Sequence, residues 1–402
     1  MAKAKGGKAA TAPFSPHIHS PLTLHRIMWD VVIALIPAAA AGIYFFGYHA
    51  AVVMGLSVAT AVITEIIMNL MLKRPISVAD GSAVITGLLF AFNLPPSAPW
   101  YVTVFGSIFA IGIVKWAFGG LGHNIMNPAL GGRIFVLAAW SGAMVNVWSP
   151  TVPSMMAKGL DFMQASDVII EKVPYYTNNI IQQVSQISNS IQTNLITNQV
   201  QVDMITGASP LGALKGMYET AAQATNALSA VSQASVSTAP SSVYSYWDLF
   251  IGNIPGCIGE TSALAILIGA FYLMFRKVLV PVLPIIYIVT VAVLIWIFGG
   301  LPMGWGWFKG DAVYHILSGG LFLGAFFMAT DYVTSPMSIP GTLIYGIMLG
   351  ILTVIIRLWG GYPEGVSYSI VFMNFFVPIL DRYIRPKIFG ARKAVLVKGG
   401  AK

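Results

Sequence analysis

The sequence predicts an all-α polytopic membrane protein with about ten transmembrane helices, arranged as two inverted five-helix repeats with broken helices. Three observations lead to this fold class. Of the 402 residues, 56% are hydrophobic and only 9% are charged, whereas soluble domains average about 25% charged residues. Apolar runs long enough to cross a bilayer as a helix recur along the chain. Shorter apolar runs that end in Gly, Pro or Asn indicate broken helices.

The N-terminal part predicts a basic cytoplasmic tail over residues 1–28 and a first membrane half over 29–144. The third apolar run of this half, 83–92, ends at Asn93-Leu94-Pro95-Pro96. A straight helix of that length is too short to cross a bilayer. The longer spans of this half are expected at 29–48, 49–72, 100–118 and after Arg133 to about Met144.

The middle and C-terminal parts complete the predicted organisation. Residues 145–247 are polar and predict an extracytoplasmic loop. Residues 248–380 form the second membrane half, and 381–402 form a basic cytoplasmic tail. The spans of the second half are expected at 256–275, 278–298, 312–330, 341–358 and 366–379.

The two halves share a short pattern that favours an inverted repeat. The run 85–90 followed by Pro95-Pro96 parallels the run 317–322 followed by Ser335-Pro336. Each pattern lies in the third of five spans. A repeat with an odd number of spans must be inverted in the membrane, so the broken spans are expected to meet near the midplane.

The distribution of positive charge predicts the orientation of the chain. With the N-terminus inside, 17 of the 22 Lys and Arg residues fall in inside segments, as the positive-inside rule requires. Both termini are therefore expected in the cytoplasm, and the 145–247 loop outside. The same rule accounts for the net charge of +8 without a nucleic-acid partner. The first apolar run is long enough to remain as a span rather than a cleaved signal.

Cysteine and histidine usage limits the redox chemistry. The single cysteine, Cys257, excludes an internal disulfide and any iron–sulfur cluster or cysteine-ligated zinc site held by this chain alone. The six histidines form no metal-binding spacing, so no metal site is expected. A redox role would therefore need an organic cofactor.

Three carboxylates lie within or beside the predicted spans and are candidates for an ion path. Glu65 lies inside the second span, whereas Asp80 and Asp331 lie at span ends in matching positions of the two halves. The alternative for Glu65 is a hydrogen-bonded packing residue. The alternative for Asp80 and Asp331 is the cap of a half-helix.

Residues 203–211, Asp-Met-Ile-Thr-Gly-Ala-Ser-Pro-Leu, hold the strongest functional signal in the polar loop. Ser209 is expected to cap a helix that starts at Pro210, and a helix N-terminus favours a bound phosphate. The stretch also resembles the flavin-attachment motif Asp-x-x-(Ser/Thr)-Gly-Ala-(Thr/Ser), in which the last hydroxyl forms a phosphoester with FMN. On that motif the attachment residue is Ser209, and the other cofactor-binding residues are Asp203, Thr206, Gly207 and Ala208.

Further stretches match one known family. They are Asp80-Gly81-Ser82-Ala83, Gly119-Gly120-Leu121-Gly122 with Asn124 and Asn127-Pro128-Ala129, Gly259-Glu260-Thr261-Ser262 with Ala263-Leu264, and Met328-Ala329-Thr330-Asp331. Through these stretches and 203–211, the chain resembles the NqrB/RnfD family of membrane subunits over nearly all ten predicted spans.

The resemblance implies a subunit of an Rnf electron-transport complex in a prokaryotic cytoplasmic (inner) membrane. Such complexes move electrons between ferredoxin and NAD⁺ and pump Na⁺ or H⁺. The subunit would carry a covalent FMN outside the membrane and relay electrons between partners, including a second covalent-flavin subunit and iron–sulfur subunits. It would not be catalytic alone. The resemblance also implies a urea-transporter-like fold and leaves open a noncovalent riboflavin.

The chain departs from the family pattern in three places. Ser209 replaces the usual Thr, which retains the esterified oxygen and loses only a methyl group. Cys257 stands where Ser is expected, and the outer loop is longer than usual.

Two further groups of residues are candidates for cofactor binding. Glu260, Thr261 and Ser262 open the sixth span on the predicted outer side, where they either line the flavin pocket or serve the start of that helix. Asn124 and Asn127 lie beside broken helix ends, where they line a flavin or ion cavity or satisfy loose carbonyl groups.

Two rival functions remain open from the sequence. A small-solute channel or transporter suits inverted repeats with broken third spans, and a scaffold subunit that has lost its flavin would retain the same fold. The 203–211 stretch distinguishes a flavin-carrying subunit from a plain channel, because a plain channel has no need of it.

Overall fold

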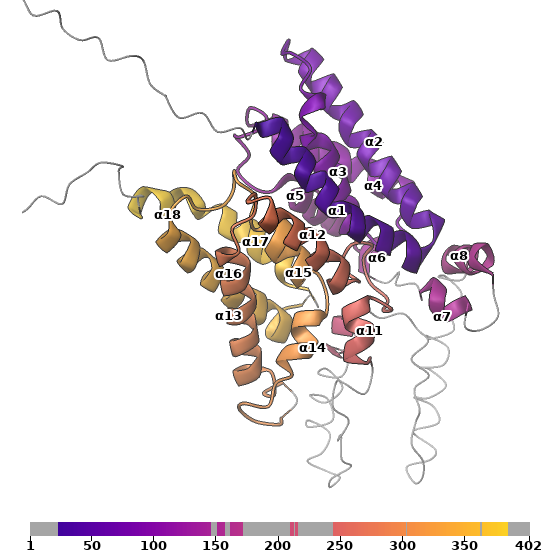
Figure 1. Cartoon of the computed structure of the whole chain (residues 1–402), viewed down its shortest axis with the longest axis vertical. Helices are drawn as coiled ribbons and strands as arrows, with labels where there is room; N and C mark the ends of the chain where they lie inside the picture. The colour runs from indigo at the N-terminus through magenta and orange to yellow at the C-terminus, as the bar shows by residue number, and fades with distance from the viewer. Residues whose placement is uncertain are drawn as a thin grey trace, which may run out of the picture.

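The computed structural model describes residues 23–145, 151–156, 161–171, 210–212, 214–215, 244–302, 304–361 and 364–384. Every regular element in the described ranges is a helix (Figure 1). The predicted all-helical class is thus confirmed. Of the 203–211 stretch, only Pro210 and Leu211 lie within the described residues.

The first membrane half begins earlier than the sequence predicted. The Thr23 side chain accepts a hydrogen bond from the Arg26 backbone N–H and caps the first helix at Leu24 rather than Trp29. The helices of this half are α1 (Leu24–Phe46), α2 (Tyr48–Met71), η1 (Val78–Asp80), α3 (Ser82–Phe92), α4 (Trp100–Ile108), η2 (Phe109–Trp116), α5 (Pro128–Ala139) and α6 (Ser141–Val145).

The start of α5 also differs from the prediction, which placed it after Arg133. The Asn127 side chain accepts hydrogen bonds from the backbone N–H groups of Ala129 and Leu130, and Pro128 occupies the first helical position. This combination of cap and proline is a strong helix start. It places Arg133 inside the helix.

Two short helices, α7 (Val152–Met156) and α8 (Phe162–Glu171), precede the second half and lie beside the α1–α2 connection (Figure 1). The second half contains α11 (Tyr246–Ile251), α12 (Ala263–Phe275), α13 (Val282–Phe298), α14 (Ala312–Leu317), α15 (Leu321–Leu323), η4 (Gly324–Met328), α16 (Ile339–Trp359), α17 (Val366–Asn374) and α18 (Val377–Tyr383).

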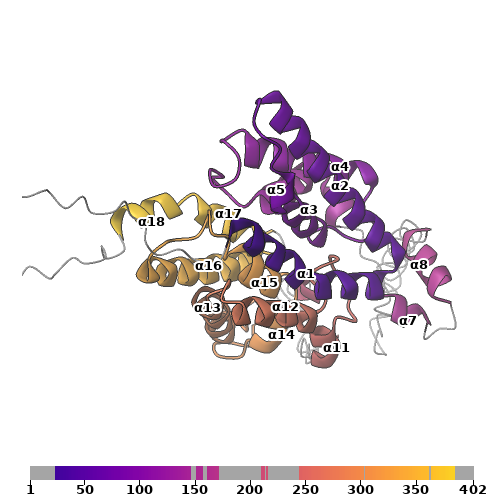
Figure 2. The same cartoon turned by 45° about the horizontal axis from the view of Figure 1, so that its top comes forward.

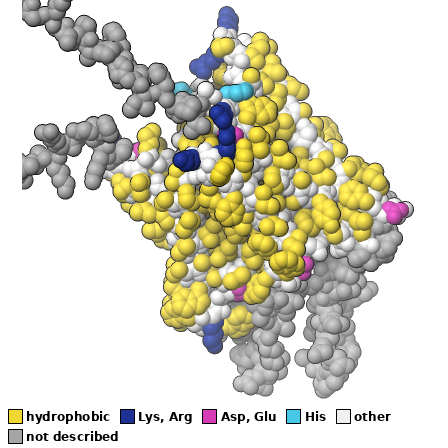
Figure 3. Space-filling view, in the orientation of Figure 1, with side chains coloured by type: hydrophobic (Ala, Val, Ile, Leu, Met, Phe, Trp, Pro, Cys, Tyr) yellow, Lys and Arg dark blue, Asp and Glu magenta, His cyan; other side chains and the backbone are white. Residues whose placement is uncertain are grey.

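Helix length and surface composition support a membrane protein. Among the described residues α1, α2 and α16 are long and apolar enough to cross a bilayer, and five shorter apolar helical segments accompany them. Hydrophobic side chains cover most of the face in Figure 3, and most of the visible Lys and Arg side chains gather toward one end of it. The count of ten spans, the inverted repeat and the domain boundaries remain predictions.

Both third segments are interrupted, and the interruptions are satisfied by protein. Helix α3 ends at Phe92, and the carbonyl oxygens of Phe92 and Leu94 accept hydrogen bonds from the N–H groups of Gly259 and Ile258, each at 3.0 Å. The predicted span 312–330 is broken at 318–320, between α14 and α15, earlier than the interruption that the sequence predicted at Ser335-Pro336. Freed backbone groups at membrane depth require such internal partners.

The two halves also meet along α1 and α12, which lie side by side (Figure 2). The Arg276 guanidinium at the end of α12 forms an ion pair with Asp30 of α1, Nη2 to Oδ2 at 3.0 Å. Farther along α12, a Cβ atom on Gly269 would lie 2.0 Å from the carbonyl oxygen of Ala34. The helices therefore approach through a position that only glycine can fill.

We expect Gly269→Ala to lower the free energy of unfolding by about 1–3 kcal/mol, the usual cost of overpacking a tight contact. Gly55→Ala in α2 is the matched control, because its Cβ would meet no atom within 4 Å. Thermal unfolding of both variants in the same detergent checks this. Equal melting temperatures for the two variants would contradict the packing derived for α1 and α12.

Candidate functional site

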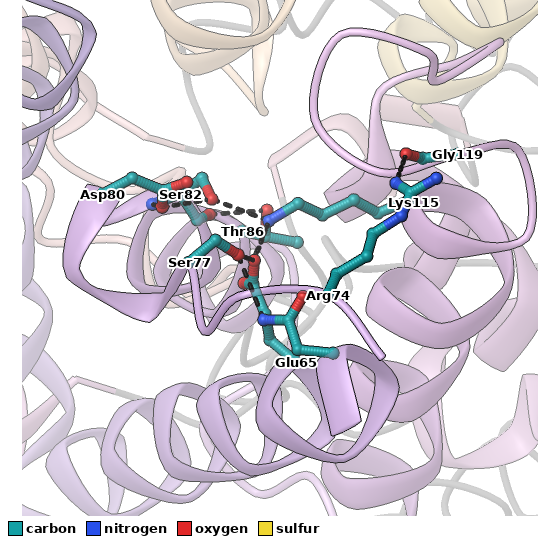
Figure 4. A network of polar contacts seen from close by, with 9 residues as sticks. Glu65, Arg74, Ser77, Asp80, Ser82, Thr86, Lys115 and Gly119 are labelled. Atoms are coloured by element: carbon teal, nitrogen blue, oxygen red, sulfur yellow. Dashed lines mark hydrogen bonds and ion pairs between the residues drawn. The ribbon is translucent and has the colours of Figure 1, made fainter. Parts of the chain in front are cut away.

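A buried ion pair lies within the first membrane half. The Lys115 ammonium in η2 contacts both carboxylate oxygens of Glu65 in α2 at 2.9 Å and donates to the Ser82 hydroxyl at 2.7 Å (Figure 4). The Ser77 hydroxyl donates to Glu65 Oε1 at 3.0 Å. We call Glu65, Ser77, Ser82 and Lys115 the Lys115 cluster. The side chains of Glu65 and Lys115 are each 1% exposed, so each charge depends on the other.

Asp80 belongs to the same network at the start of α3. Its Oδ1 accepts hydrogen bonds from the Ser82 backbone N–H at 2.8 Å and from the Ser82 hydroxyl at 2.6 Å (Figure 4). Asp80 thus holds Ser82, which in turn contacts Lys115. Asp80 therefore orients the cluster in addition to starting the helix.

A cavity lies between the two halves beside the Lys115 cluster, with about 810 Å³ of empty space including its open mouth. Both halves line it. The predicted residues Asn124, Asn127 and Asp331 meet here with Ser82 and Lys115. The buried Asn124 Oδ1 has no hydrogen-bond partner among the described residues. The cavity can therefore offer a ligand an unused polar atom beside a buried cation.

A second ion cluster joins the two halves around Arg133 of α5. Arg133 Nη1 donates to Asn93 Oδ1 and to Glu260 Oε1, both at 2.6 Å. Arg133 Nη2 donates to Glu364 Oε2 at 2.5 Å. We call Asn93, Arg133, Glu260 and Glu364 the Arg133 cluster. Burial acts to raise the pKa of Glu364, but the charge of Arg133 and the hydrogen bonds outweigh it and hold that pKa below its usual value.

Arg357, in the last turn of α16, lies beside this cluster. Its Nη1 donates to the carbonyl oxygen of His315 at 2.5 Å, and its Nη2 donates to that of Ser318 at 3.3 Å. These carbonyls lie at the break between α14 and α15. The side chain is buried, and Arg357 forms no ion pair with any described residue.

The residues that follow the predicted attachment serine pack on this part of the second half. Pro210 is helical, as predicted, and its carbonyl oxygen accepts a hydrogen bond from the Tyr314 hydroxyl at 3.1 Å. Leu211 and Leu214 are buried, and the Lys215 ammonium donates to the carbonyl oxygen of Gly360. Asp203, Thr206, Gly207, Ala208 and Ser209 lie outside the described residues.

Leu211 and Glu364, a member of the Arg133 cluster, both lie close to Gly319. A Cβ atom placed on Gly319 would lie 2.7 Å from Leu211 Cδ1, 3.3 Å from Glu364 Oε1 and 3.5 Å from Arg357 Nη2. These three side chains therefore crowd around one glycine. Leu211, two residues after the predicted attachment residue, therefore lies in the same neighbourhood as Glu364 and Arg357.

Unused polar atoms lie near the same glycine-containing break, and they are of the kinds that a flavin edge can bond. Within the described ranges, four buried side-chain atoms here have no hydrogen-bond partner, namely Glu260 Oε2, Thr261 Oγ1, Ser318 Oγ and Arg357 Nε. Buried polar atoms normally have partners. A flavin edge presents donors and acceptors that complement this mixed set. The third predicted residue, Ser262, instead caps α12 by accepting a hydrogen bond from the Ala265 N–H at 3.2 Å.

Sequence reasoning placed Asn124, Asn127, Glu260 and Thr261 beside cavities or unused polar atoms, but it missed Lys115, Glu364 and Arg357 as site residues. Lys115 and Arg357 each lie in an apolar segment, and an ionisable residue in such a segment is a candidate functional residue. Their partners are distant in sequence, so only the fold shows what they contact.

Comparisons with known proteins agree with this description. The profile of the family described as NQR2, RnfD, RnfE matches residues 11–390. The chain is 38% identical over 385 residues to the D subunit of the Na(+)-translocating ferredoxin:NAD(+) oxidoreductase complex of Acetobacterium woodii, covering 95% of this chain and 96% of that one. It is 37% identical over 384 residues to the D subunit of the proton-translocating ferredoxin:NAD(+) oxidoreductase complex of Clostridium ljungdahlii, covering 95% and 97%. It is 33% identical over 369 residues to the D subunit of the ion-translocating oxidoreductase complex of Stutzerimonas stutzeri, covering 92% of each chain.

Proposed function

The chain belongs to the NQR2, RnfD, RnfE family, and on this basis we propose that it is the D subunit of an ion-translocating ferredoxin:NAD⁺ oxidoreductase complex. The observation that carries the proposal is similarity along the whole chain to relatives with that name. The partners are the other subunits of the complex, including a second covalent-flavin subunit and iron–sulfur subunits, together with membrane lipid. No nucleic acid is involved.

We propose that FMN is joined through its phosphate to Ser209 on the outer face of the cytoplasmic membrane. When bound, the isoalloxazine ring supplies the electron transfer. The chain supplies position and electrostatics. Tyr314 fixes the carbonyl group of Pro210, the residue after the attachment serine. Arg133 holds the Glu260 carboxylate so that Oε2 remains available, and Thr261 adds a hydroxyl.

We propose that the cavity between the halves holds a second, noncovalent flavin, riboflavin. The unused Asn124 Oδ1 and the neighbouring Lys115 ammonium support this assignment. Asn124→Leu is expected to lower the acid-extractable flavin by about one equivalent per complex, because the hydrogen-bonding amide is replaced by a hydrocarbon side chain. Quantification of released flavin checks the prediction, and the covalent fraction serves as the internal control. Unchanged extractable flavin would remove Asn124 from this site.

The identity of the pumped ion is not set by similarity, because relatives of almost equal identity are named for Na⁺ and for protons. Glu65 is already paired with Lys115, and Asp80 is engaged with Ser82. Asp331 lines the cavity, and burial raises its pKa against the opposing effect of its hydrogen bonds. We propose Asp331 as the member of the predicted ion path that binds or releases a cation.

The proposed function predicts that membranes of cells lacking this chain lose ferredoxin-dependent NAD⁺ reduction, and that a plasmid copy restores it. The physical reason is that the covalent flavin links partner carriers that cannot exchange electrons without it. Activity in Na⁺-free and Na⁺-containing buffer then distinguishes the two ions. Unchanged electron transfer together with rapid solute flux through proteoliposomes of the purified chain would instead support the channel alternative.

A further inference from the structure

A second open space lies between the starts of α13 and α16, at the end of the second half that is predicted to face the cytoplasm. It has about 1090 Å³ of empty space including its open mouth. Residues within 278–283 form one wall, and residues within 335–342 form the other. We call this space the α13–α16 groove. We propose that it binds the acyl chain of one anionic phospholipid, whose phosphate lies at Lys277.

The groove is largely apolar, and its rim is exposed on the outside of the helices. Helix α16 is long and apolar enough to cross a membrane, and α13 lies beside it (Figure 2). Val280, Met337 and Ile339 line the groove and are exposed. Apolar side chains at the end of a membrane-spanning helix face lipid. An empty groove would leave its lining without contacts, so a hydrocarbon chain from the bilayer fills it.

The hydroxyl groups of the groove offer little to a polar ligand. The Thr330 and Thr342 hydroxyls each donate to the carbonyl oxygen four residues earlier, at 2.7 and 3.0 Å. The Tyr332 hydroxyl donates to the carbonyl oxygen of Val278. Three of the four hydroxyl side chains that line the groove are therefore already bonded to the backbone. This arrangement favours a hydrocarbon chain over a sugar or a flavin, because polar groups are costly to bury without partners.

The groove adjoins the cavity between the two halves but is a different site. The residues that line both spaces are Val278, Leu279, Thr330 and Tyr332. The hydrogen bond from Tyr332 to Val278 ties together two parts of this boundary. The lipid chain therefore packs on one side of the boundary, and Asp331 lines the cavity on the other side.

A cation beside the groove selects an anionic headgroup. Lys277 directly precedes the groove residue Val278, and Lys277 is exposed. It forms no ion pair with any described residue, whereas the neighbouring Arg276 pairs with Asp30. Lysine residues at the membrane surface attract the acidic phospholipids of the cytoplasmic leaflet. One phospholipid can therefore place its phosphate at Lys277 and its chain in the groove.

The test adds phosphatidylglycerol or phosphatidylcholine with a photoreactive acyl chain to the intact purified complex in detergent. Mass spectrometry after irradiation and proteolysis locates the labelled peptides. We expect phosphatidylglycerol to label 278–283 and 335–342, and phosphatidylcholine to label them about fivefold less, the usual effect of one lysine near an acidic lipid. Equal labelling by the two lipids overturns the selection of an anionic headgroup. An unlabelled groove in the intact complex overturns the site.

Two variants test the chain and the headgroup separately. Val282→Trp fills the groove and should abolish labelling there, whereas Val289→Trp, at an exposed position of α13 outside the groove, is the matched control and should retain it. Lys277→Glu changes only an exposed side chain and should lower labelling by phosphatidylglycerol at least fivefold, and Lys309→Glu, at another exposed cation, should not. Full labelling in Val282→Trp or in Lys277→Glu overturns the proposal. None of these measurements involves a flavin, so their failure leaves the proposed function standing.

Discussion

Replacing Ser209 with Ala is expected to abolish the covalent flavin of this chain completely. The methyl group of alanine cannot form a phosphoester, and no other hydroxyl occupies the attachment position of the 203–211 motif. The measurement is ultraviolet fluorescence of the denatured protein band after electrophoresis. Yellow-green emission should be present in the wild type and absent in Ser209→Ala.

Two control variants sharpen this experiment. Thr206→Ala removes the neighbouring hydroxyl of the same motif and should retain the emission, whereas Ser209→Thr supplies the residue more usual in the family and should also retain it. The loss of a helix cap in Ser209→Ala costs only about 1 kcal/mol, so the Pro210–Tyr314 contact is expected to persist. A dark wild-type band from cells that contain the attaching enzyme would contradict the assignment.

Replacing Lys115 with Met is expected to lower the free energy of unfolding by about 3–5 kcal/mol, the usual cost of leaving one member of a buried ion pair alone. Glu65 would then lose its only charged contact among the described residues, although Ser77 still donates to it. Glu65→Met should cost a similar amount, because it leaves the Lys115 ammonium buried without its carboxylate.

The double variant Glu65→Met with Lys115→Met decides whether the pair acts as one unit. Replacing both members of a buried pair with apolar residues is often close to neutral, so the double variant should be far more stable than the two single costs predict together. Thermal unfolding in one detergent measures the cycle. Lys309→Met, at an exposed cation, is the control and should change little. Additive losses in the double variant would show that the Glu65–Lys115 contact is not coupled.

The family resemblance predicted from the sequence is confirmed by the family match over residues 11–390. The prediction was possible because short motifs depend on residues that are neighbours in the sequence. Pro210 is helical, and the prediction succeeded because a proline at the first helical position needs no distant partner. The helix starts that follow Thr23 and Asn127 were missed because their side-chain caps override the apolar pattern by a few residues.

The break at 318–320 was also missed by the sequence. Ser318-Gly319-Gly320 lies inside an apolar run, and Gly is tolerated within transmembrane helices when neighbours satisfy the freed backbone groups. Here the neighbour is Arg357, whose guanidinium donates to the carbonyl oxygens of His315 and Ser318. No local rule identifies a partner 39 residues away.

An all-helical membrane protein of a known family follows from the amino-acid sequence alone, because hydrophobic run length and motif chemistry are properties of neighbouring residues. The pairing of the buried charges, in contrast, depends on the fold. Lys115 pairs with Glu65, which is 50 residues away in the sequence, and Arg133 pairs with Glu364, which is 231 residues away. In a buried environment a charge persists only where a partner is placed within a few ångströms, and that placement is set by the packing of helices rather than by their order along the chain.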